Sequence, residues 1–258
     1  MSTASAISTQ TRVVYALILR EVHTLYGHTS LGYLWALIEG AFGIAVIWGV
    51  RTILHSRAPH GMSELTYLAV GFCVWSIINQ TLTKSMTAVD GNRALLTFPQ
   101  VTPLDVMVSR AMVVWITSVL NTCIIFGIGA MFGHQLVIAN VTMLIFSLVL
   151  AGLLGLGLGM LCATLAVYMQ ALQNIVPMVL RVLFFTSGIF FSVTRLPKSV
   201  GDYLLLNPIM QLVEMTRSSL HPGYMVTYIN IEYAVCCVVV LFPLGLLLER
   251  YTRRKQKL

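Results

Sequence analysis

Long apolar segments, separated by short polar ones, dominate the chain from residue 31 onward. Six of them are long enough, or nearly so, to cross the roughly 30 Å hydrocarbon core of a bilayer. They are Leu31–Leu54, Leu65–Leu82, Val106–Phe132, Val141–Met169, Ile175–Val193 and Ile231–Leu248. A segment in lipid must satisfy its backbone hydrogen bonds internally, so each is expected to be helical. The pattern therefore predicts an all-α polytopic membrane protein with six transmembrane helices.

Residues 12–26 show apolar positions at helical spacing on one side only. The apolar face comprises Val14, Ile18, Val22 and Leu25 with Tyr15, Leu19 and Tyr26 beside them, and the other face carries Arg12, Arg20, His23 and Thr24. A basic face opposite a short apolar face is typical of an amphipathic helix lying in the headgroup region. A helix packed on a soluble partner would show the same pattern, so both interpretations remain open for residues 1–30.

The stretch Thr194–Asn230 is apolar only in part, around the sequence LLLNPIMQLV, and that run is too short to span a bilayer. Pro208 and the pair Pro222–Gly223 interrupt helices here. We therefore expect short re-entrant or interfacial helices at 194–230, before the last span.

The polar stretch Lys84–Asp105 reads KSMTAVDGNRALLTFPQVTPLD. Its first half is expected to form a short amphipathic helix ending near Phe98, because Pro99 and Pro103 then prevent continuation. Such a helix suits insertion into a groove on a soluble partner. A solvated loop is the alternative for this segment, 84–103.

Composition agrees with a lipid environment, since 57% of the 258 residues are hydrophobic and only 10% are charged. A soluble domain carries about 25% charged residues, so this chain has too few to cover a water-facing surface. If both termini are cytoplasmic, ten of the 16 Lys and Arg residues fall on the inner side, which favours that orientation. The outer side then holds Arg51, Arg57, Arg195, Lys198 and Arg217. This orientation gives transmembrane helices 1–5 within 31–193, an extracytoplasmic segment at 194–230, and the sixth helix with a basic tail at 231–258.

Catalytic and metal-binding motifs are absent from the sequence. There is no GxxxxGK[ST] nucleotide loop, no HExxH and no GxSxG. The five cysteines lie in apolar runs without metal-ligand spacing and are expected to be small buried hydrophobes. We therefore predict no catalytic residue, no metal site and no cofactor on this chain.

Three charged residues fall within or near the edges of the apolar segments, where lipid makes them costly: Glu39, Arg110 and Arg181. Arg110 is close enough to a segment end to reach the interface. Arg181 is deeper, so it either contacts an anionic substrate or forms a structural pair with Glu39 or with a backbone carbonyl. Aromatic residues near these segments form an interfacial belt or line a conduit. The resulting candidates for a substrate path are Arg20, Tyr26, Tyr33, Trp35, Glu39, Arg181 and Phe185.

Four sequence stretches together resemble the ABC-2 permeases of capsule polysaccharide exporters, the KpsM type. They are LILRE at Leu17–Glu21, GYLWALIE at Gly32–Glu39, NRALLTFPQVTPLD at Asn92–Asp105, and NP, VEMTR and HPGY within Asn207–Tyr224. The likeness covers nearly the whole chain in order and spacing. Gly40 departs from the proline that such permeases commonly carry after the acidic residue.

The resemblance implies a type V exporter-like fold and a homodimer flanked by two copies of a separate ATPase that binds ATP and Mg²⁺. It implies export of a lipid-linked acidic polysaccharide across the inner membrane of a Gram-negative bacterium. Periplasmic co-polymerase-like and outer-membrane proteins would carry the polymer onward, and no nucleic acid is involved. By analogy, the 84–98 segment is a coupling helix, with Asp90, Asn92, Arg93, Leu95, Leu96 and Phe98 as its contact residues.

Two other classes remain open at this stage. An ion-coupled small-molecule transporter would need ionisable groups near the midplane, for which Glu39 and Arg181 are candidates. A membrane scaffold would give Arg181 no evident role. Among exporters, O-antigen, teichoic acid or drug cargo is also compatible with this chain.

Overall fold

The computed structural model describes residues 3–26, 30–55, 58–92, 95–98, 100–131, 133, 137–224 and 228–256; the side chains of 3–9, 24–40, 60, 90 and 256 are outside that description. Over these residues the chain is helical and contains no strand, which confirms the all-α fold. The helices are α1 (Thr3–Tyr26), α2 (Ser30–Ile53), α3 (Glu64–Met86), α4 (Pro103–Met131), α5 (Val141–Tyr168), α6 (Leu172–Thr186), α7 (Lys198–Leu204), α8 (Pro208–Leu220) and α9 (Ile231–Gln256).

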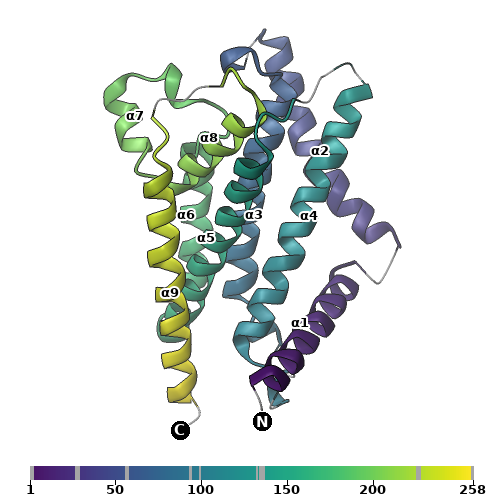
Figure 1. The fold of residues 1–258 in the computed structure, drawn as a ribbon, viewed down its shortest axis with the longest axis vertical. Coiled ribbons are helices and arrows are strands. Elements are labelled where there is room, and N and C mark those ends of the chain that lie inside the picture. Colours follow the sequence, from purple (N-terminus) through teal and green to yellow (C-terminus); the bar gives the residue numbers. More distant parts are fainter. Residues whose placement is uncertain are drawn as a thin grey trace.

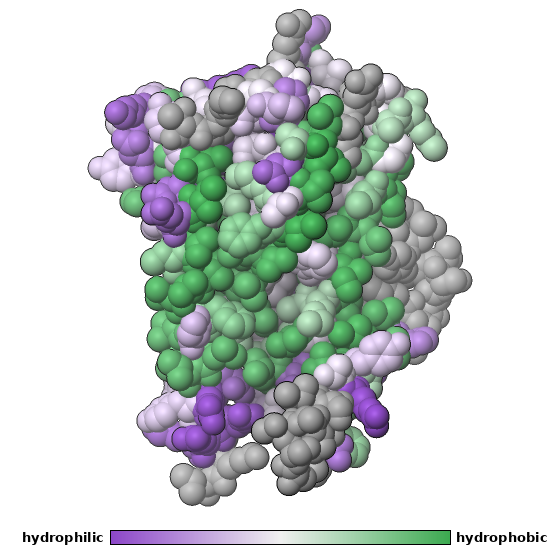
Figure 2. All heavy atoms as spheres, in the orientation of Figure 1, coloured by the Kyte–Doolittle hydropathy of each residue, from purple (hydrophilic) through white to green (hydrophobic). Residues whose placement is uncertain are grey.

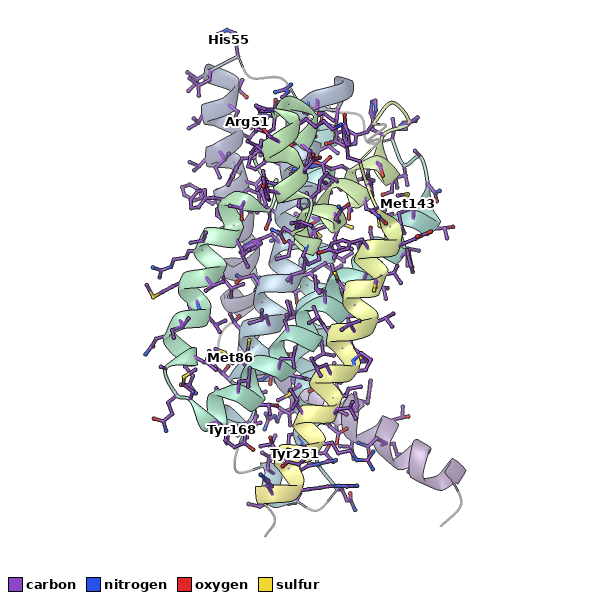
Figure 3. All side chains as sticks on the ribbon, turned by 90° about the vertical axis from the view of Figure 1, so that its left-hand side faces the viewer. Arg51, His55, Met86, Met143, Tyr168 and Tyr251 are labelled. Carbon is purple, nitrogen blue, oxygen red and sulfur yellow. The ribbon has the colours of Figure 1, made fainter. Side chains whose placement is uncertain are left out.

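The long helices run along one axis of the molecule, and both α1 and the end of α9 lie at the same end (Figure 1). We call this the terminal end; Met86, Tyr168 and Tyr251 lie near it, whereas Arg51 and His55 lie at the opposite end (Figure 3). Between the two ends the surface is a band of apolar side chains, bounded by polar ones above and below (Figure 2). Helices α3, α4, α5 and α9 are each long and apolar enough to cross a membrane. The chain is therefore a multi-pass membrane protein.

The fifth predicted span was wrong in length, because α6 ends at Thr186 rather than near Val193. Its 15 residues extend about 22 Å, less than a typical hydrocarbon core. Gly188 adopts φ 69°, a left-handed conformation that stops the helix. The chain then passes through a single 3₁₀ turn, Val193–Arg195, before α7.

Helix α1 begins earlier than predicted, at Thr3, and packs on α4. Leu17 and Glu21 are buried against the bundle, whereas Tyr15 and Leu19 are exposed. Val22 is exposed as well, whereas Val14 and Ile18 are half-buried, so the predicted apolar face is turned only in part away from the other helices. The α1 axis is oblique to the long helices in both ribbon views (Figures 1 and 3).

The prediction of a short helix in the 84–98 segment is also wrong. This segment is part of the connection between α3 and α4, residues 87–102. Helix α3 continues to Met86, and the chain then forms two 3₁₀ turns, Asp90–Asn92 and Leu95–Thr97. Helix α4 starts with a capping box: the Thr102 hydroxyl accepts from the Asp105 N–H, and the Asp105 carboxylate accepts from the Thr102 N–H at 2.8 Å. With Pro103 as the first helical residue, these bonds determine where the connection ends.

The expectation of short helices before the last span is confirmed by α7 and α8. Helix α8 begins at Pro208, and the Asn207 side chain caps it by accepting from the Ile209 N–H at 3.0 Å. All of its residues except Pro208 and Ser218 are buried, including the charged Glu214 and Arg217. The helix is therefore enclosed by the bundle rather than lying on its surface.

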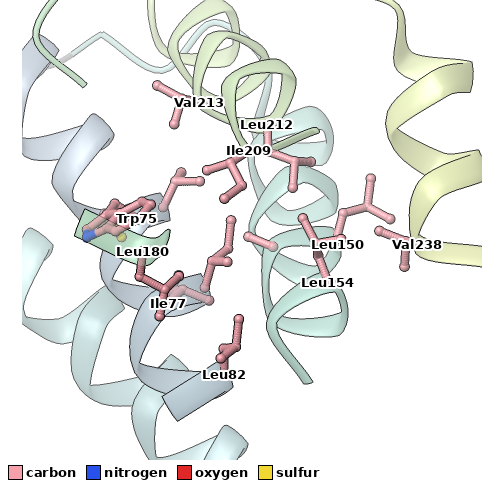
Figure 4. Close-up of a cluster of buried hydrophobic side chains, with 14 of the residues drawn as sticks. Trp75, Ile77, Leu82, Leu150, Leu154, Leu180, Ile209, Leu212, Val213 and Val238 are labelled. Atoms are coloured by element: carbon pink, nitrogen blue, oxygen red, sulfur yellow. The ribbon is translucent and has the colours of Figure 1, made fainter. Parts of the chain in front are cut away.

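The core lies where α3, α5, α8 and α9 meet (Figure 4). Glycines let α5 approach two helices closely, because they have no side chain to keep the backbones apart. A Cβ on Gly155 would come within 2.9 Å of the Ile78 carbonyl oxygen in α3. On another side of α5, a Cβ on Gly157 would come within 2.9 Å of the Phe242 Cα in α9. Helix α5 is therefore the central element, and its glycines set its distance to both neighbours.

Replacing Gly157 with leucine is expected to push α9 from α5 and to lower stability by about 3 kcal/mol, since the obstructing atoms are backbone. The melting temperature of the detergent-purified protein would measure this. Gly127→Leu in α4 is the matched control, because no atom lies within 4 Å of its added Cβ. Equal melting temperatures for the two variants would contradict close α5–α9 packing.

Candidate functional site

A groove of about 410 Å³ lies between α3 and α6. Trp75, Asn79 and Thr83 line it from α3, four residues apart and so on one helical face. Helix α6 contributes Pro177, Leu180, Arg181, Phe184 and Phe185. The sequence predicted Arg181 and Phe185 as path residues, and the structure brings them together with three polar or aromatic residues of α3.

The groove combines three kinds of recognition group. Phe184 contacts the rings of Trp75 and Phe185, with centroids 5.5 and 5.2 Å apart, so its wall is aromatic. Asn79 and Thr83 supply an amide and a hydroxyl. Arg181 is exposed and carries a guanidinium, which binds carboxylate or phosphate in a forked geometry. An apolar face, hydrogen-bonding groups and a cation together suit an acidic sugar.

Four other predicted path residues have side chains outside the described part of the structure: Tyr26, Tyr33, Trp35 and Glu39. The pairing of Arg181 with Glu39 therefore stays a prediction. Arg20 is not in the groove. Its side chain lies at the terminal end, where it donates to the Asn92 carboxamide oxygen.

The predicted coupling residues differ in accessibility. Asn92 is buried and donates to the Ala88 carbonyl at 2.9 Å. Leu95 and Leu96 are half-buried and pack on an apolar cluster that includes Leu17 of α1. Phe98 is 60% exposed and is therefore the coupling candidate best placed to meet another protein. The side chains of Asp90 and Arg93 lie outside the described residues.

Polar contacts that sequence reasoning missed join α1 to the start of α4 and, through Arg110, to the end of α3; we call them the α1 clamp. The Arg110 guanidinium pairs with the Glu21 carboxylate at 3.0 Å and donates to the Lys84 carbonyl at 3.1 Å. Gln10 donates to Asp105, near the start of α4. The signal was present in the spacing of Gln10, Leu17 and Glu21, which share one helical face.

A second polar cluster, the Arg217 network, lies around α8 and is fully buried. Arg217 pairs with Glu214 at 3.1 Å and donates to the Gly188 and Ile189 carbonyls at 2.7 and 2.8 Å. Its guanidinium also lies 3.5 Å from the centroid of the Tyr67 ring in α3. The network therefore links α8 to α3 and to the turn that ends α6. Counting Lys and Arg residues along the sequence places Arg217 on the outer side, because the count treats every charged side chain as exposed.

The Glu214 carboxylate is satisfied on its other side by hydroxyls. Tyr224 donates to it at 2.8 Å and Ser192 at 3.2 Å. Burial, aided by the adjacent carboxylate, raises the pKa of the Tyr224 phenol well above its ordinary value. Tyr224 therefore remains protonated and continues to donate at any physiological pH.

Metal binding has no support in the part of the chain that the structure describes. Within it, no three His, Cys, Asp or Glu residues lie close enough together to hold an ion. The groove offers aromatic rings, one amide, one hydroxyl and one guanidinium for recognition.

Four helices of membrane length define this chain as a multi-pass membrane protein, and the groove between α3 and α6 carries the guanidinium of Arg181. Residues 12–221 match the family model described as ABC-2 type transporter, and the chain belongs to that family.

Three relatives extend over almost the whole chain. The polysialic acid transport protein KpsM of Escherichia coli is 29% identical over 246 residues, which cover 95% of each chain. The capsule polysaccharide export inner-membrane protein CtrC of Neisseria meningitidis serogroup B is 24% identical, covering 93% of this chain and 91% of the relative. The corresponding protein BexB of Haemophilus influenzae is 23% identical, covering 95% and 92%.

Proposed function

We propose that this chain is the membrane-spanning subunit of an ATP-driven exporter that moves a lipid-linked acidic capsular polysaccharide across the bacterial inner membrane. The observation that carries the proposal is the end-to-end similarity to relatives named for polysialic acid transport and capsule polysaccharide export. In this proposal the chain is a homodimer, because a closed path requires a second wall opposite the α3–α6 groove.

Energy would come from a separate ATPase, present in two copies with ATP and Mg²⁺, because the sequence has no nucleotide-binding loop. The α3–α4 connection is the proposed docking segment, with Phe98 exposed for contact. A displacement of the connection would reach α1 through the α1 clamp, since Arg110 of α4 pairs with Glu21 of α1 and donates to the Lys84 carbonyl at the end of α3. Periplasmic co-polymerase-like and outer-membrane proteins would receive the polymer.

Both termini are proposed to be cytoplasmic. The last turn of α9 carries Arg253, Arg254 and Lys255, and α1 carries Arg12 and Arg20 at the same end. Lys and Arg residues gather on the cytoplasmic side of membrane proteins. The terminal end is therefore assigned to the cytoplasm, where a soluble ATPase can reach the α3–α4 connection.

Export can be tested in the source bacterium by deleting the gene and restoring variants of it. The deletion strain should keep its polysaccharide inside the cell, and the unchanged gene should return it to the surface. Arg181→Ala should lower surface polymer about tenfold, because a charge-assisted hydrogen bond is lost, and Arg181→Lys should keep part of it. Immunoblotting of membranes would show whether each variant is present at normal level.

Two results would contradict this function. One is normal surface polysaccharide in the deletion strain. The other is robust ATP hydrolysis by the purified chain alone, since the motor is assigned to a partner.

Lys198→Ala on α7 is the control for loss of an exposed positive charge, and it should export normally.

A further inference from the structure

A second cavity, of about 370 Å³, lies at the terminal end between the ends of α3, α5 and α9 and the start of α4. Its apolar walls include Met86, Met107 and Ala163, and its polar lining includes Glu249 and Arg253. We call it the α9 cavity. It is separate from the α3–α6 groove, and Val89 of the proposed docking segment and Pro103 at the start of α4 form part of its wall.

Glu249 is the unusual residue of this cavity. Its side chain is only 8% exposed, yet its Oε1 atom has no hydrogen-bond partner among the described residues. Arg253 Nε lies 3.8 Å from this oxygen, too far for a hydrogen bond. A buried carboxylate left in this state is costly, so a donor inside the cavity would stabilise it.

Arg253 gives the cavity a positive group beside this negative one. Its side chain is 33% exposed, so the guanidinium can meet an anion from outside. Thr252 and Gln170 add a hydroxyl and an amide to the lining. The Glu249 carboxylate and the Arg253 guanidinium are one helical turn apart. They can therefore bind a zwitterion, with its ammonium on Glu249 and its phosphate on Arg253.

The depth of the cavity indicates the source of that zwitterion. Glu249 lies 18 residues after Ile231, about 27 Å along α9, which is close to the full thickness of the hydrocarbon core. Tyr251, 54% exposed, sits at the level where aromatic side chains meet headgroups, and the polar end of α9 follows it (Figure 2). Val167 is exposed at the cavity rim and gives acyl chains an apolar surface.

We propose that the α9 cavity binds the headgroup of phosphatidylethanolamine, with the ammonium on Glu249 and the phosphate on Arg253. The primary ammonium is essential, because it donates hydrogen bonds to the free carboxylate oxygen. The trimethylammonium of phosphatidylcholine has no N–H and cannot do so. The site should therefore discriminate between two lipids of equal charge.

Native mass spectrometry of the purified chain with each lipid, carrying identical acyl chains, tests this proposal. The unchanged chain should bind phosphatidylethanolamine about tenfold more tightly than phosphatidylcholine. Glu249→Gln should remove that preference. Glu232→Gln, an exposed glutamate in the first turn of the same helix, should keep it.

A second variant keeps the test decisive if Glu249→Gln does not fold. Ala163→Leu fills the cavity without changing either charge, so it should also remove the preference. Equal binding of both lipids by the unchanged chain, or a preference that survives both variants, would overturn the proposal. Soluble phosphoethanolamine should compete only at far higher concentration than the lipid; tighter binding of the soluble compound would overturn the lipid assignment.

Discussion

Arg217→Met is expected to leave little folded protein in the membrane. The substitution removes every bond of the guanidinium and leaves the Glu214 carboxylate buried without its cation. Breaking a buried ion pair by removing one partner costs about 3–5 kcal/mol, a large share of a typical stability of about 5–15 kcal/mol. The loss should appear as low abundance and as a lower melting temperature of the detergent-purified protein.

Glu214→Gln should be milder than Arg217→Met, because it keeps an oxygen for the Tyr224 hydroxyl and leaves the carbonyl bonds of Arg217 intact. Lys198→Met, an exposed residue of α7, controls for loss of a positive charge and should melt like the unchanged chain. If Arg217→Met melted at the same temperature as this control, the network would contribute nothing to stability.

Reversing either charge of the α1 clamp is expected to abolish export. Glu21→Arg places two cations at a site where Glu21 is 5% and Arg110 16% exposed, and Arg110→Glu places two anions there. Each single reversal should cost about 3 kcal/mol. Combining the two should restore part of the surface polysaccharide, although the bond from Arg110 to the Lys84 carbonyl is not recovered.

Surface polysaccharide and membrane abundance of the three variants give a double-mutant cycle, whose coupling term isolates the pair. Glu232→Arg serves as the matched exposed reversal in α9. Normal export by both single variants would show that export does not need the ion pair between α1 and α4. An equally inactive double variant would show that the two residues act separately.

The apolar pattern located the long helices well, because a membrane span is recognised from the hydropathy of about 20 consecutive residues and needs no distant contact. The end of α6 could not be predicted in this way. It depends on the left-handed conformation of Gly188 and on the bond from Arg217 to the Gly188 carbonyl. Arg217 lies 29 residues further along the chain, so the local sequence around Thr186 does not reveal this contact. The hydrophobic run continues past Thr186, so hydropathy alone overestimates the span.

The candidate site was predicted in part. Arg181 was identified because a guanidinium inside an apolar segment is costly, and Phe185 by its aromatic character. Trp75, Asn79 and Thr83 were not identified, since their role depends on which face of α3 meets α6. The contact face of α1 was missed for a related reason: polar pairs such as Glu21 with Arg110 determine it, and a search for apolar periodicity does not detect them.

The short α6 has a consequence for the lipid around it. At about 22 Å it stands beside α5, whose 28 residues extend about 42 Å, so the two helices do not match the same bilayer thickness. A bilayer adapts to a short apolar helix by thinning or by admitting polar groups at its ends. Arg181 lies about 14 Å from the first residue of α6, so a local depression of the membrane would bring water close to it. The barrier to a charged sugar would then be lowest along the helix that carries the guanidinium.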